Sequence, residues 1–221
     1  MNRDWCLVSG EKTAGLAASV AGYVLAGGAS SRFGSDKALA QLGGETMLAR
    51  MYGLLRELTL RVSVVGSSAK YTGVEAQIVP DRWPGEGPLG GIITALEHTR
   101  ASDLKVAHCL VVSCDMPFLR AEWLQYLCGY AANSAAEIVV PRSTQGLEPL
   151  CACWRTDGAE TLHALFEGGV RKVTEVFKHT QTEILDEAHW KRFDSAGRLF
   201  WNMNTPQDYQ DALEIFAEER R

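Results

Sequence analysis

The chain has 221 residues, of which 46% are hydrophobic and 22% are charged, and its formal net charge is −5. This composition is typical of a globular protein with a substantial core rather than of a disordered chain. The acidic balance argues against a general nucleic-acid-binding surface, and no apolar stretch is long enough for a membrane-spanning helix.

The cysteines and the N-terminal segment bear on the compartment and on the domain boundary. None of the six cysteines forms a Cys-x-x-Cys pair, so we expect buried, reduced thiols in a cytoplasmic protein. Residues 1–19 mix charged and apolar side chains and lack the apolar block of a signal peptide. We interpret them as a short, poorly ordered extension that precedes a single domain over residues 20–221.

The first predicted strand, Val20–Leu25, leads into a loop rich in glycine and serine, and residues 23–37 read Y-V-L-A-G-G-A-S-S-R-F-G-S-D-K. Glycines let a backbone approach a ligand closely, and successive N–H groups of such a loop can bind an anion. Arg32 and Lys37 add two positive charges that suit phosphate. A helix predicted over Ala38–Leu55 would direct its positive end to the same place. The pattern predicts a polyphosphate site.

This loop differs from two common phosphate-binding loops. Gly28 and Gly34 have five residues between them, and Lys37 does not follow a glycine, so the loop is not a Walker A sequence. The dinucleotide pattern G-x-G-x-x-G is also absent. A glycine-rich surface turn is the alternative interpretation, and the charges of Arg32 and Lys37 count against it.

Strand-like and helix-like segments alternate along the rest of the chain. The further predicted strands are Arg61–Val65, Ala76–Val79, His108–Ser113, Glu137–Val140 and Pro149–Trp154, and the further helices are Ile92–Thr99 and Ala121–Ala132. This alternation predicts an α/β fold: a single Rossmann-like domain of three layers, with a mostly parallel central sheet and helices on both faces. Ligands of such sheets bind beyond the carboxyl ends of the strands, where the loop, Asp81 and Asp115 all fall.

Asp115 is the candidate metal ligand. It follows the apolar strand 108–113 closely, and Pro117 ends that run. A carboxylate at the end of a rigid strand can hold Mg²⁺ against a triphosphate. Capping of the next helix is the alternative for an aspartate in this position, and the residues by themselves leave both open.

The loop sequence L-A-G-G-A-S-S-R-F-G-S-D-K most resembles the molybdenum cofactor guanylyltransferase family (MobA-like nucleotidyltransferases), whose pattern is close to L-A-G-G-x-S-x-R-M-G-x-D-K. The paired glycines favour guanylyl over cytidylyl transfer within this group. Four other segments are also similar to the family: D-M-P-F at 115–118, G-P-L-G-G at 87–91, E-P-L-C-A-C-W at 148–154 and N-M-N-T-P-Q-D at 202–208. The resemblance extends from Val20 to Leu213 and implies the nucleotidyltransferase fold.

The resemblance implies an enzyme that transfers GMP from GTP to the terminal phosphate of Mo-molybdopterin, with Mg²⁺ as cofactor and pyrophosphate as the second product. It implies catalytic roles for Lys37, Arg32 and Asp115, with Asp115 as the metal ligand. Nucleotide binding would involve Leu25, Ala26, Gly27, Gly28, Lys37, Gly66, Asp81 and Asp115. The acceptor side would include Asn202 and Asn204. Besides GTP and Mo-molybdopterin, we expect transient contact with molybdopterin-loading proteins or molybdoenzymes.

Two observations leave alternatives open. Asp81 can accept hydrogen bonds from the N1–H and the 2-amino group of guanine, but a turn aspartate beside prolines and glycines is the simpler interpretation without the resemblance. Family members often carry an asparagine where this chain has Gly66. The alternatives are therefore a nucleotidyltransferase with another base or acceptor, such as a cytidylyltransferase of molybdopterin or a sugar-phosphate nucleotidyltransferase, and a non-catalytic carrier that binds nucleotide or cofactor.

Overall fold

The computed structural model describes residues 20–27, 36–71 and 74–219. The expected extension over residues 1–19, the glycine Gly28 and the catalytic candidate Arg32 lie outside these ranges. In the described part of the chain, no helix combines the length and the hydropathy that a transmembrane helix requires.

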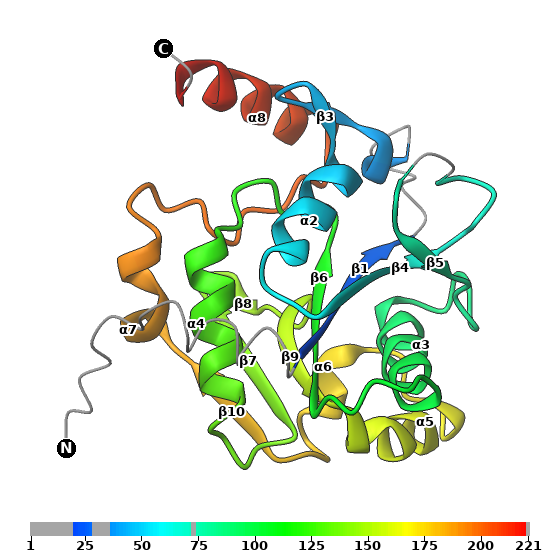
Figure 1. The fold of residues 1–221 in the computed structure, drawn as a ribbon. Helices are drawn as coiled ribbons and strands as arrows, with labels where there is room; N and C mark the ends of the chain where they lie inside the picture. The colour runs from blue at the N-terminus through cyan, green and yellow to red at the C-terminus, as the bar shows by residue number, and fades with distance from the viewer. Residues whose placement is uncertain (1–19, 28–35, 72–73, 220–221) are drawn as a thin grey trace.

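An eight-stranded mixed sheet occupies the centre of the molecule (Figure 1). Its strands follow the order β10-β7-β9-β6-β1-β4-β5, and β8 pairs with β7 beside this path. Strand β9 is antiparallel to both of its neighbours, whereas β6, β1, β4 and β5 are parallel to one another. The strands are β1 (Val20–Ala26), β4 (Arg61–Gly66), β5 (Gln77–Val79), β6 (His108–Ser113), β7 (Ile138–Ser143), β8 (Gly146–Leu147), β9 (Cys151–Arg155) and β10 (Thr182–Leu185).

Helices cover both faces of this sheet. One face packs against α2 (Met47–Arg56) and α4 (Ala121–Ala131), and the other against α3 (Pro88–Ala101), α5 (Ala159–Glu167) and α6 (Val173–Val176). The remaining helices are α7 (Glu187–Trp190), α8 (Pro206–Glu219) and the 3-10 turns η1 (Lys37–Leu39), η2 (Thr156–Gly158) and η3 (Lys191–Phe193). The predicted α/β fold with three layers and a mostly parallel sheet is thus confirmed.

Strand β1 lies at the centre because every one of its side chains is buried. Val24 and Ala26 point into the core under α2 and α4, whereas Tyr23 and Leu25 point into the core under α3 and α5. This division follows the two-residue period of a strand. Because both faces are covered, the strand is an apolar run rather than an alternating one, as is usual in parallel sheets.

The predicted helix over Ala38–Leu55 is wrong in its first half. After η1, the chain forms a small hairpin of β2 (Gln41–Leu42) and β3 (Glu45–Thr46), and α2 begins only at Met47. Gly43 and Gly44, with φ of 66° and 96°, make the two-residue turn between these strands. The Thr46 hydroxyl then caps α2 by accepting from the Ala49 amide at 3.1 Å. The helix N-terminus that follows the phosphate loop therefore lies further along the chain than expected.

Helix α3 also departs from its predicted bounds, because it begins at Pro88 rather than Ile92. The segment 87–91, predicted as a loop, is thus the start of a helix, with Gly87 as N-cap and Pro88 in the first turn. Proline suits this position because its fixed φ is helical and its missing N–H is not needed there. Three helices and two strands between 144 and 190 were not predicted at all: α5, α6, α7, β8 and β10.

Helix α8 and the β2–β3 hairpin form a separate small cluster at one end of the molecule (Figure 1). Leu42, Met47, Met203 and Ala212 are its buried residues, and the Tyr209 hydroxyl donates to the Gln41 carbonyl at 2.6 Å. The preceding segment is fixed on the sheet by a hydrogen bond from the Met203 amide to the Asp115 carbonyl at 2.9 Å. This arrangement brings residues 202–204 to the end of β6.

Gly66 closes β4 at a point where there is no room for a side chain. A Cβ atom at this position would lie 2.2 Å from the Ala26 carbonyl oxygen and 2.9 Å from Cε2 of Tyr71. We expect Gly66→Ala to lower the free energy of unfolding by about 2 kcal/mol because the backbone of β1 must shift. Gly53→Ala is the matched control: Gly53 is exposed in α2 with open space beside it, so the change should stabilise slightly. Scanning calorimetry of both variants tests this, and an unchanged Tm for Gly66→Ala would contradict it.

Candidate active site

A cavity of about 320 Å³ opens at the carboxyl ends of the parallel strands β1, β4, β5 and β6. This is the edge at which open α/β sheets bind their ligands. Apart from Leu25, Val65 and Leu150, its wall consists mainly of glycines and polar residues: Gly27, Asp36, Lys37, Asp81, Gly85, Gly87, Pro88, Gly91, Ser113, Cys114 and Asp115. The described ends of the phosphate loop, Gly27 and Lys37, therefore meet Asp81 and Asp115 in one cavity, as the sequence predicted for this edge.

Lys37 lies at the start of η1, and its side chain is 16% exposed. The ammonium is 3.4 Å from Oδ2 of Asp115 and donates to Oδ1 of Asn204 at 2.8 Å. These two partners come from the end of β6 and from the segment before α8, so one positive charge joins two distant parts of the chain. A compact ammonium of this kind suits a phosphate oxygen as well as a carboxylate.

Asp115 has one engaged and one free carboxylate oxygen. Oδ2 faces Lys37, whereas Oδ1 is buried and has no hydrogen-bond partner among the described residues. A buried carboxylate oxygen without a partner is costly, and a hard cation such as Mg²⁺ would satisfy it. No group of three or more His, Cys, Asp or Glu side chains suited to a metal occurs in the described chain. A magnesium ion at Asp115 would therefore take most ligands from phosphates and water, as Mg²⁺ usually does.

Asp36 also lines the cavity, although it is not among the site residues predicted from the sequence. Its Oδ1 accepts from the Ala38 amide at 3.1 Å and caps η1, and its Oδ2 accepts from the Tyr71 hydroxyl at 3.1 Å. Burial and the neighbouring carboxylate of Asp36 raise the pKa of Tyr71, so the phenol stays protonated as a donor. Asp36 thus fixes the turn that carries Lys37. The signal in the sequence is the aspartate that directly precedes the lysine.

Asp81 follows β5 and begins a turn beside the cavity. Its Oδ1 accepts from the Trp83 amide at 3.0 Å, so the turn interpretation is correct for one oxygen. The other carboxylate oxygen has no partner among the described residues, and Asp81 is part of the cavity wall. Gly85 and Gly87, with φ of 86° and 92°, continue this wall toward the N-terminus of α3.

The remaining nucleotide-binding candidates divide into two groups. Leu25 and Gly27 line the cavity, whereas Ala26 and Gly66 lie beside it, with Gly66 packed against the Ala26 carbonyl. Because a Cβ at Gly66 would overlap this carbonyl, no larger side chain, asparagine included, has space at Gly66 in this backbone.

The two acceptor-side asparagines have different surroundings. Asn204 is exposed and accepts from Lys37, whereas the Asn202 amide donates to the Phe200 carbonyl at 3.0 Å. The carboxylate of Asp208 accepts from the Asn204 and Thr205 amides at 2.7 and 2.8 Å, which fixes the chain at Asn204 and caps α8. Only Asn204 is therefore brought to the cavity by a contact.

Glu148 is a buried acid that is not among the site residues predicted from the sequence. Its Oε1 accepts from the Ser143 hydroxyl at 2.5 Å, within the β7–β8 turn. Burial raises the pKa of this carboxyl, and the charge of Asp115 raises it further. The segment that follows Glu148 reaches the end of β6, because the Ser113 amide donates to the Leu150 carbonyl at 2.9 Å and Leu150 lines the cavity.

Comparison with known proteins agrees with this geometry. Residues 22–184 match the family model of the MobA-like NTP transferase domain. The chain is 31% identical over 202 residues to a probable molybdenum cofactor guanylyltransferase from Pelotomaculum thermopropionicum, covering 90% of this chain and 94% of the relative. It is 34% identical over 197 residues to the molybdenum cofactor guanylyltransferase of Rhizobium johnstonii, covering 87% and 91% of the two chains.

Solved structures show the same fold. A molybdopterin-guanine dinucleotide biosynthesis protein A from Archaeoglobus fulgidus superposes with a TM-score of 0.76 at 25% identity, covering 90% of this chain and 99% of that one. A 2-C-methyl-D-erythritol 4-phosphate cytidylyltransferase from Thermus thermophilus has a TM-score of 0.62 at 16% identity and covers 87% and 96%, which shows the shared fold alone. The chain therefore belongs to the MobA-like nucleotidyltransferase family of molybdenum cofactor guanylyltransferases, as its phosphate loop predicted.

Proposed function

We propose that Lys37 and Asp115 form the centre at which this enzyme transfers GMP from GTP to the terminal phosphate of Mo-molybdopterin, with release of pyrophosphate. The observation that carries the proposal is the position of Lys37 between Asp115 and Asn204 at the edge of the cavity. One charge there can contact the donor triphosphate on the Asp115 side and the acceptor on the Asn204 side.

The reaction needs orientation and charge neutralisation more than proton transfer. A phosphate oxygen of the acceptor forms the bond to the α-phosphorus, and the bond to the bridging oxygen of pyrophosphate breaks. Because that phosphate is already ionised at neutral pH, a strong general base is not required. Lys37, and Arg32 in the loop, would hold the phosphates in line, and Asp115 would hold the metal. A bound Mg²⁺ would neutralise negative charge on the triphosphate and on the leaving pyrophosphate.

The segment from Asp81 to the start of α3 would bind the nucleoside. The free oxygen of Asp81 can accept from the N1–H or the 2-amino group of guanine, a donor pair that adenine and cytosine lack. Gly87 caps α3 without a side-chain hydrogen bond and Pro88 has no N–H, so the amides of Leu89 and Gly90 have no side-chain cap at the start of the helix. Helix α3 would then supply the helix N-terminus that the residue pattern predicts directly after the phosphate loop.

A second cavity of about 330 Å³ supports an acceptor side next to this centre. One part of its wall is aromatic (Trp190, Phe200 and Trp201), and hydroxyl, amide and carboxylate groups of Ser143, Gln145 and Asp194 complete the set that a pterin ring requires. Trp201 and Asn204 are three residues apart, which spans about 10 Å of extended chain. A pterin in this cavity would thus place its phosphate group near Lys37.

We also propose the compartment and the protein partners of this reaction. The five cysteines of the described chain are buried thiols, which fits the reducing cytoplasm. In this proposal other proteins deliver Mo-molybdopterin to the enzyme or receive its product. The enzyme would therefore contact molybdopterin-loading proteins or molybdoenzymes transiently.

A nucleotide panel tests the proposed reaction. We expect pyrophosphate release from GTP, and not from CTP, ATP or UTP, when Mg²⁺ and Mo-molybdopterin are present, because only guanine offers Asp81 two donors. Release from CTP instead would show that the chain has the cytidylyl activity. Nucleotide binding without pyrophosphate release would identify a carrier, and release only with a sugar phosphate would identify another acceptor.

A further inference from the structure

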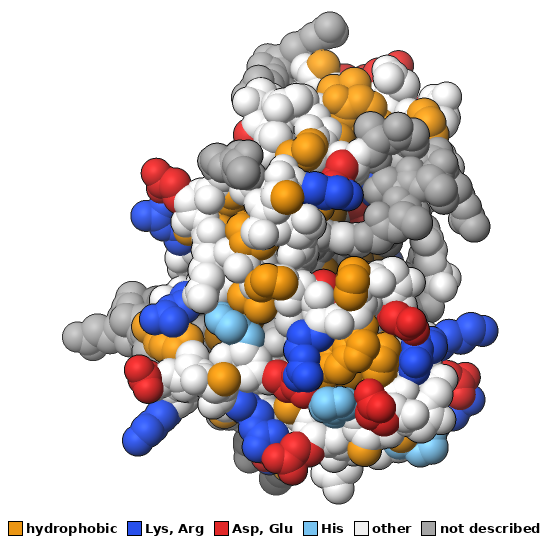
Figure 2. Space-filling view, turned by 90° about the vertical axis from the view of Figure 1, so that its right-hand side faces the viewer, with side chains coloured by type: hydrophobic (Ala, Val, Ile, Leu, Met, Phe, Trp, Pro, Cys, Tyr) orange, Lys and Arg blue, Asp and Glu red, His pale blue; other side chains and the backbone are white. Residues whose placement is uncertain are grey.

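The segment 81–87, which we call the nucleotide loop, has an inner and an outer side. Asp81, Gly85 and Gly87 on the inner side line the cavity. The outer side contacts α3 and α5, two helices of which only the start of α3 reaches the cavity wall. Acidic, basic and histidine side chains lie close together on this face of the molecule (Figure 2).

Trp83 fills the space between the nucleotide loop and the two helices. A Cβ atom added at Gly90 of α3 would lie 3.1 Å from the Cβ of Trp83. Position 90 of this helix therefore has little room for a residue larger than glycine. The Trp83 ring contacts α5 at His163 and Phe166, with centroid distances of 5.3 and 5.0 Å. The packing of this partly buried indole fixes the middle of the loop against both helices.

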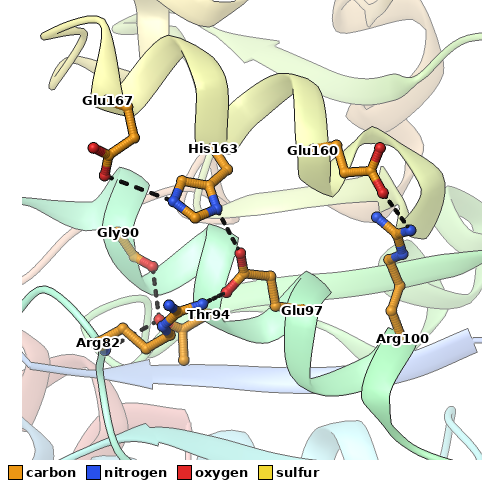
Figure 3. A network of polar contacts seen from close by, with 8 residues as sticks. All are labelled: Arg82, Gly90, Thr94, Glu97, Arg100, Glu160, His163 and Glu167. Carbon is orange, nitrogen blue, oxygen red and sulfur yellow. Dashed lines mark hydrogen bonds and ion pairs between the residues drawn. The ribbon is translucent and has the colours of Figure 1, made fainter.

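A chain of polar contacts holds the first half of the loop (Figure 3). The Arg82 guanidinium pairs with Glu97 of α3, and the other oxygen of Glu97 is 2.8 Å from Nδ1 of His163 in α5. The Arg82 amide also donates to the Thr94 hydroxyl at 3.2 Å. Arg82 is therefore held through its backbone and its side chain.

The second half of the loop depends on Arg171, which follows α5. Glu86 stands between Gly85 and Gly87, two residues with positive φ and no side chain to hold them. Nε of Arg171 donates to Glu86 at 2.7 Å, and Nη1 donates to the Phe166 carbonyl at 2.6 Å. The Arg171 guanidinium also lies 3.9 Å from the centroid of the Phe166 ring. Glu86 is thus the point at which both glycines are fixed to a rigid helix.

The Arg171–Glu86 pair contributes little to stability, because both side chains are about half exposed and such pairs are screened by water. The pair can nevertheless fix the position of the nucleotide loop, because Glu86 belongs to that loop. The loop has no helix or strand between Asp81 and Pro88, and its own hydrogen bonds, from the Glu86 amide to the Trp83 carbonyl at 3.1 Å and from the Trp83 amide to Asp81 at 3.0 Å, form only a turn. The contacts with α3, α5 and Arg171 therefore fix where this turn lies relative to the cavity. A small displacement of binding groups is enough to weaken binding substantially.

We propose that Arg171 is a positioning residue for the guanine nucleotide: through Glu86 it holds Gly85 and Gly87 at the cavity wall. Asp81 at the other end is held through Trp83 and the Arg82–Glu97–His163 chain. This inference rests on the proposed assignment of the nucleotide loop to nucleotide binding. Arg171 acts through the loop and is not assigned contact with the reacting atoms.

The test measures binding of GTP and of ATP by titration calorimetry, in the presence of Mg²⁺ and without an acceptor. We expect Arg171→Ala to raise the Kd for GTP about tenfold, with a smaller change for ATP, because the base contacts are those that the loop carries. At saturating GTP the kcat should stay within about twofold of wild type, since the phosphate centre is unchanged. Arg171→Lys should restore only part of the affinity, because an ammonium lacks the forked geometry.

Arg100→Ala is the matched control. The Arg100–Glu160 pair joins the same two helices at 2.7 Å but does not touch the nucleotide loop (Figure 3). We expect this variant to bind GTP like wild type, and Glu86→Ala to reproduce Arg171→Ala, with the double variant Glu86→Ala/Arg171→Ala no weaker than either. Wild-type affinity in Arg171→Ala, or equal losses in Arg100→Ala, would overturn the inference.

The same data separate this inference from the proposed reaction. If wild type binds GTP and only the Glu86 and Arg171 variants lose affinity, the positioning role stands even when no GMP is transferred. If wild type transfers GMP and Arg171→Ala binds GTP normally, the reaction stands and the positioning role falls. If wild type binds no nucleotide, both are wrong.

Discussion

Asp115→Asn is expected to reduce turnover about a thousandfold or more, because a metal bound at this site would contribute several kcal/mol to charge stabilisation. The substitution keeps the shape of the side chain and removes its negative charge. The amide keeps an oxygen that can accept from Lys37, and the buried Oδ1 has no partner among the described residues, so the variant loses the charge attraction to Lys37 without losing a hydrogen bond. We therefore expect the Tm of this variant to remain close to that of wild type.

The measurement is pyrophosphate release as a function of Mg²⁺ concentration, together with removal of Mg²⁺ by EDTA. Chelation should abolish the wild-type activity, and added Mg²⁺ should restore it. Asp157→Asn is the control, because Asp157 is exposed, pairs with Arg155 and lies outside the cavity. Full activity of Asp115→Asn at ordinary Mg²⁺ would refute the metal assignment.

Lys37→Ala should lower kcat/KM for GTP about a hundredfold or more, since removal of one preorganised donor to a developing charge has an effect of this size. Its ammonium stands between Asp115 and Asn204, so both the donor and the acceptor phosphates lose a counter-charge. Lys37→Arg should recover little, because the longer planar guanidinium cannot occupy the same point between the two partners.

Steady-state kinetics with GTP and with the acceptor varied separately will show which substrate Lys37 serves. We expect the KM for GTP and the KM for the acceptor both to rise, or kcat to fall. A rise in the KM for GTP alone would show that Lys37 does not contact the acceptor. Lys178→Ala is the control, because Lys178 is exposed and pairs only with Glu175 on the described chain. Unchanged kinetics in Lys37→Ala would exclude this lysine from the site.

Much of the central sheet could be predicted because its signals are local. The strands at 20–26, 61–66 and 108–113 are short apolar runs bounded by polar or glycine-rich segments, and the structure forms β1, β4 and β6 within a residue of the predicted bounds. Their parallel arrangement follows from the intervening helices. The placement of Asp81 and Asp115 at one edge follows from this arrangement alone.

Prediction from local sequence failed where one segment contains both helix-forming residues and a turn signal. Residues 38–46 contain good helix formers, but Gly43 and Gly44 adopt positive φ and turn the chain into a hairpin. That hairpin is stabilised by α8, more than 160 positions away, through the bond from Tyr209 to Gln41. The glycine pair at 43–44 is a local turn signal that counts against a helix, whereas the contact with α8 joins residues too far apart for any local window of sequence.

The sequence by itself determined the fold class, the family and the chemical types at the cavity, because these depend on apolar runs and on a continuous motif. The tertiary structure alone decided which of these residues meet. Lys37 and Asn204 are 167 positions apart, and Arg171 and Glu86 are 85 apart. Their contacts arise because the sheet order places distant segments side by side, an outcome of packing over the whole chain that no local pattern encodes.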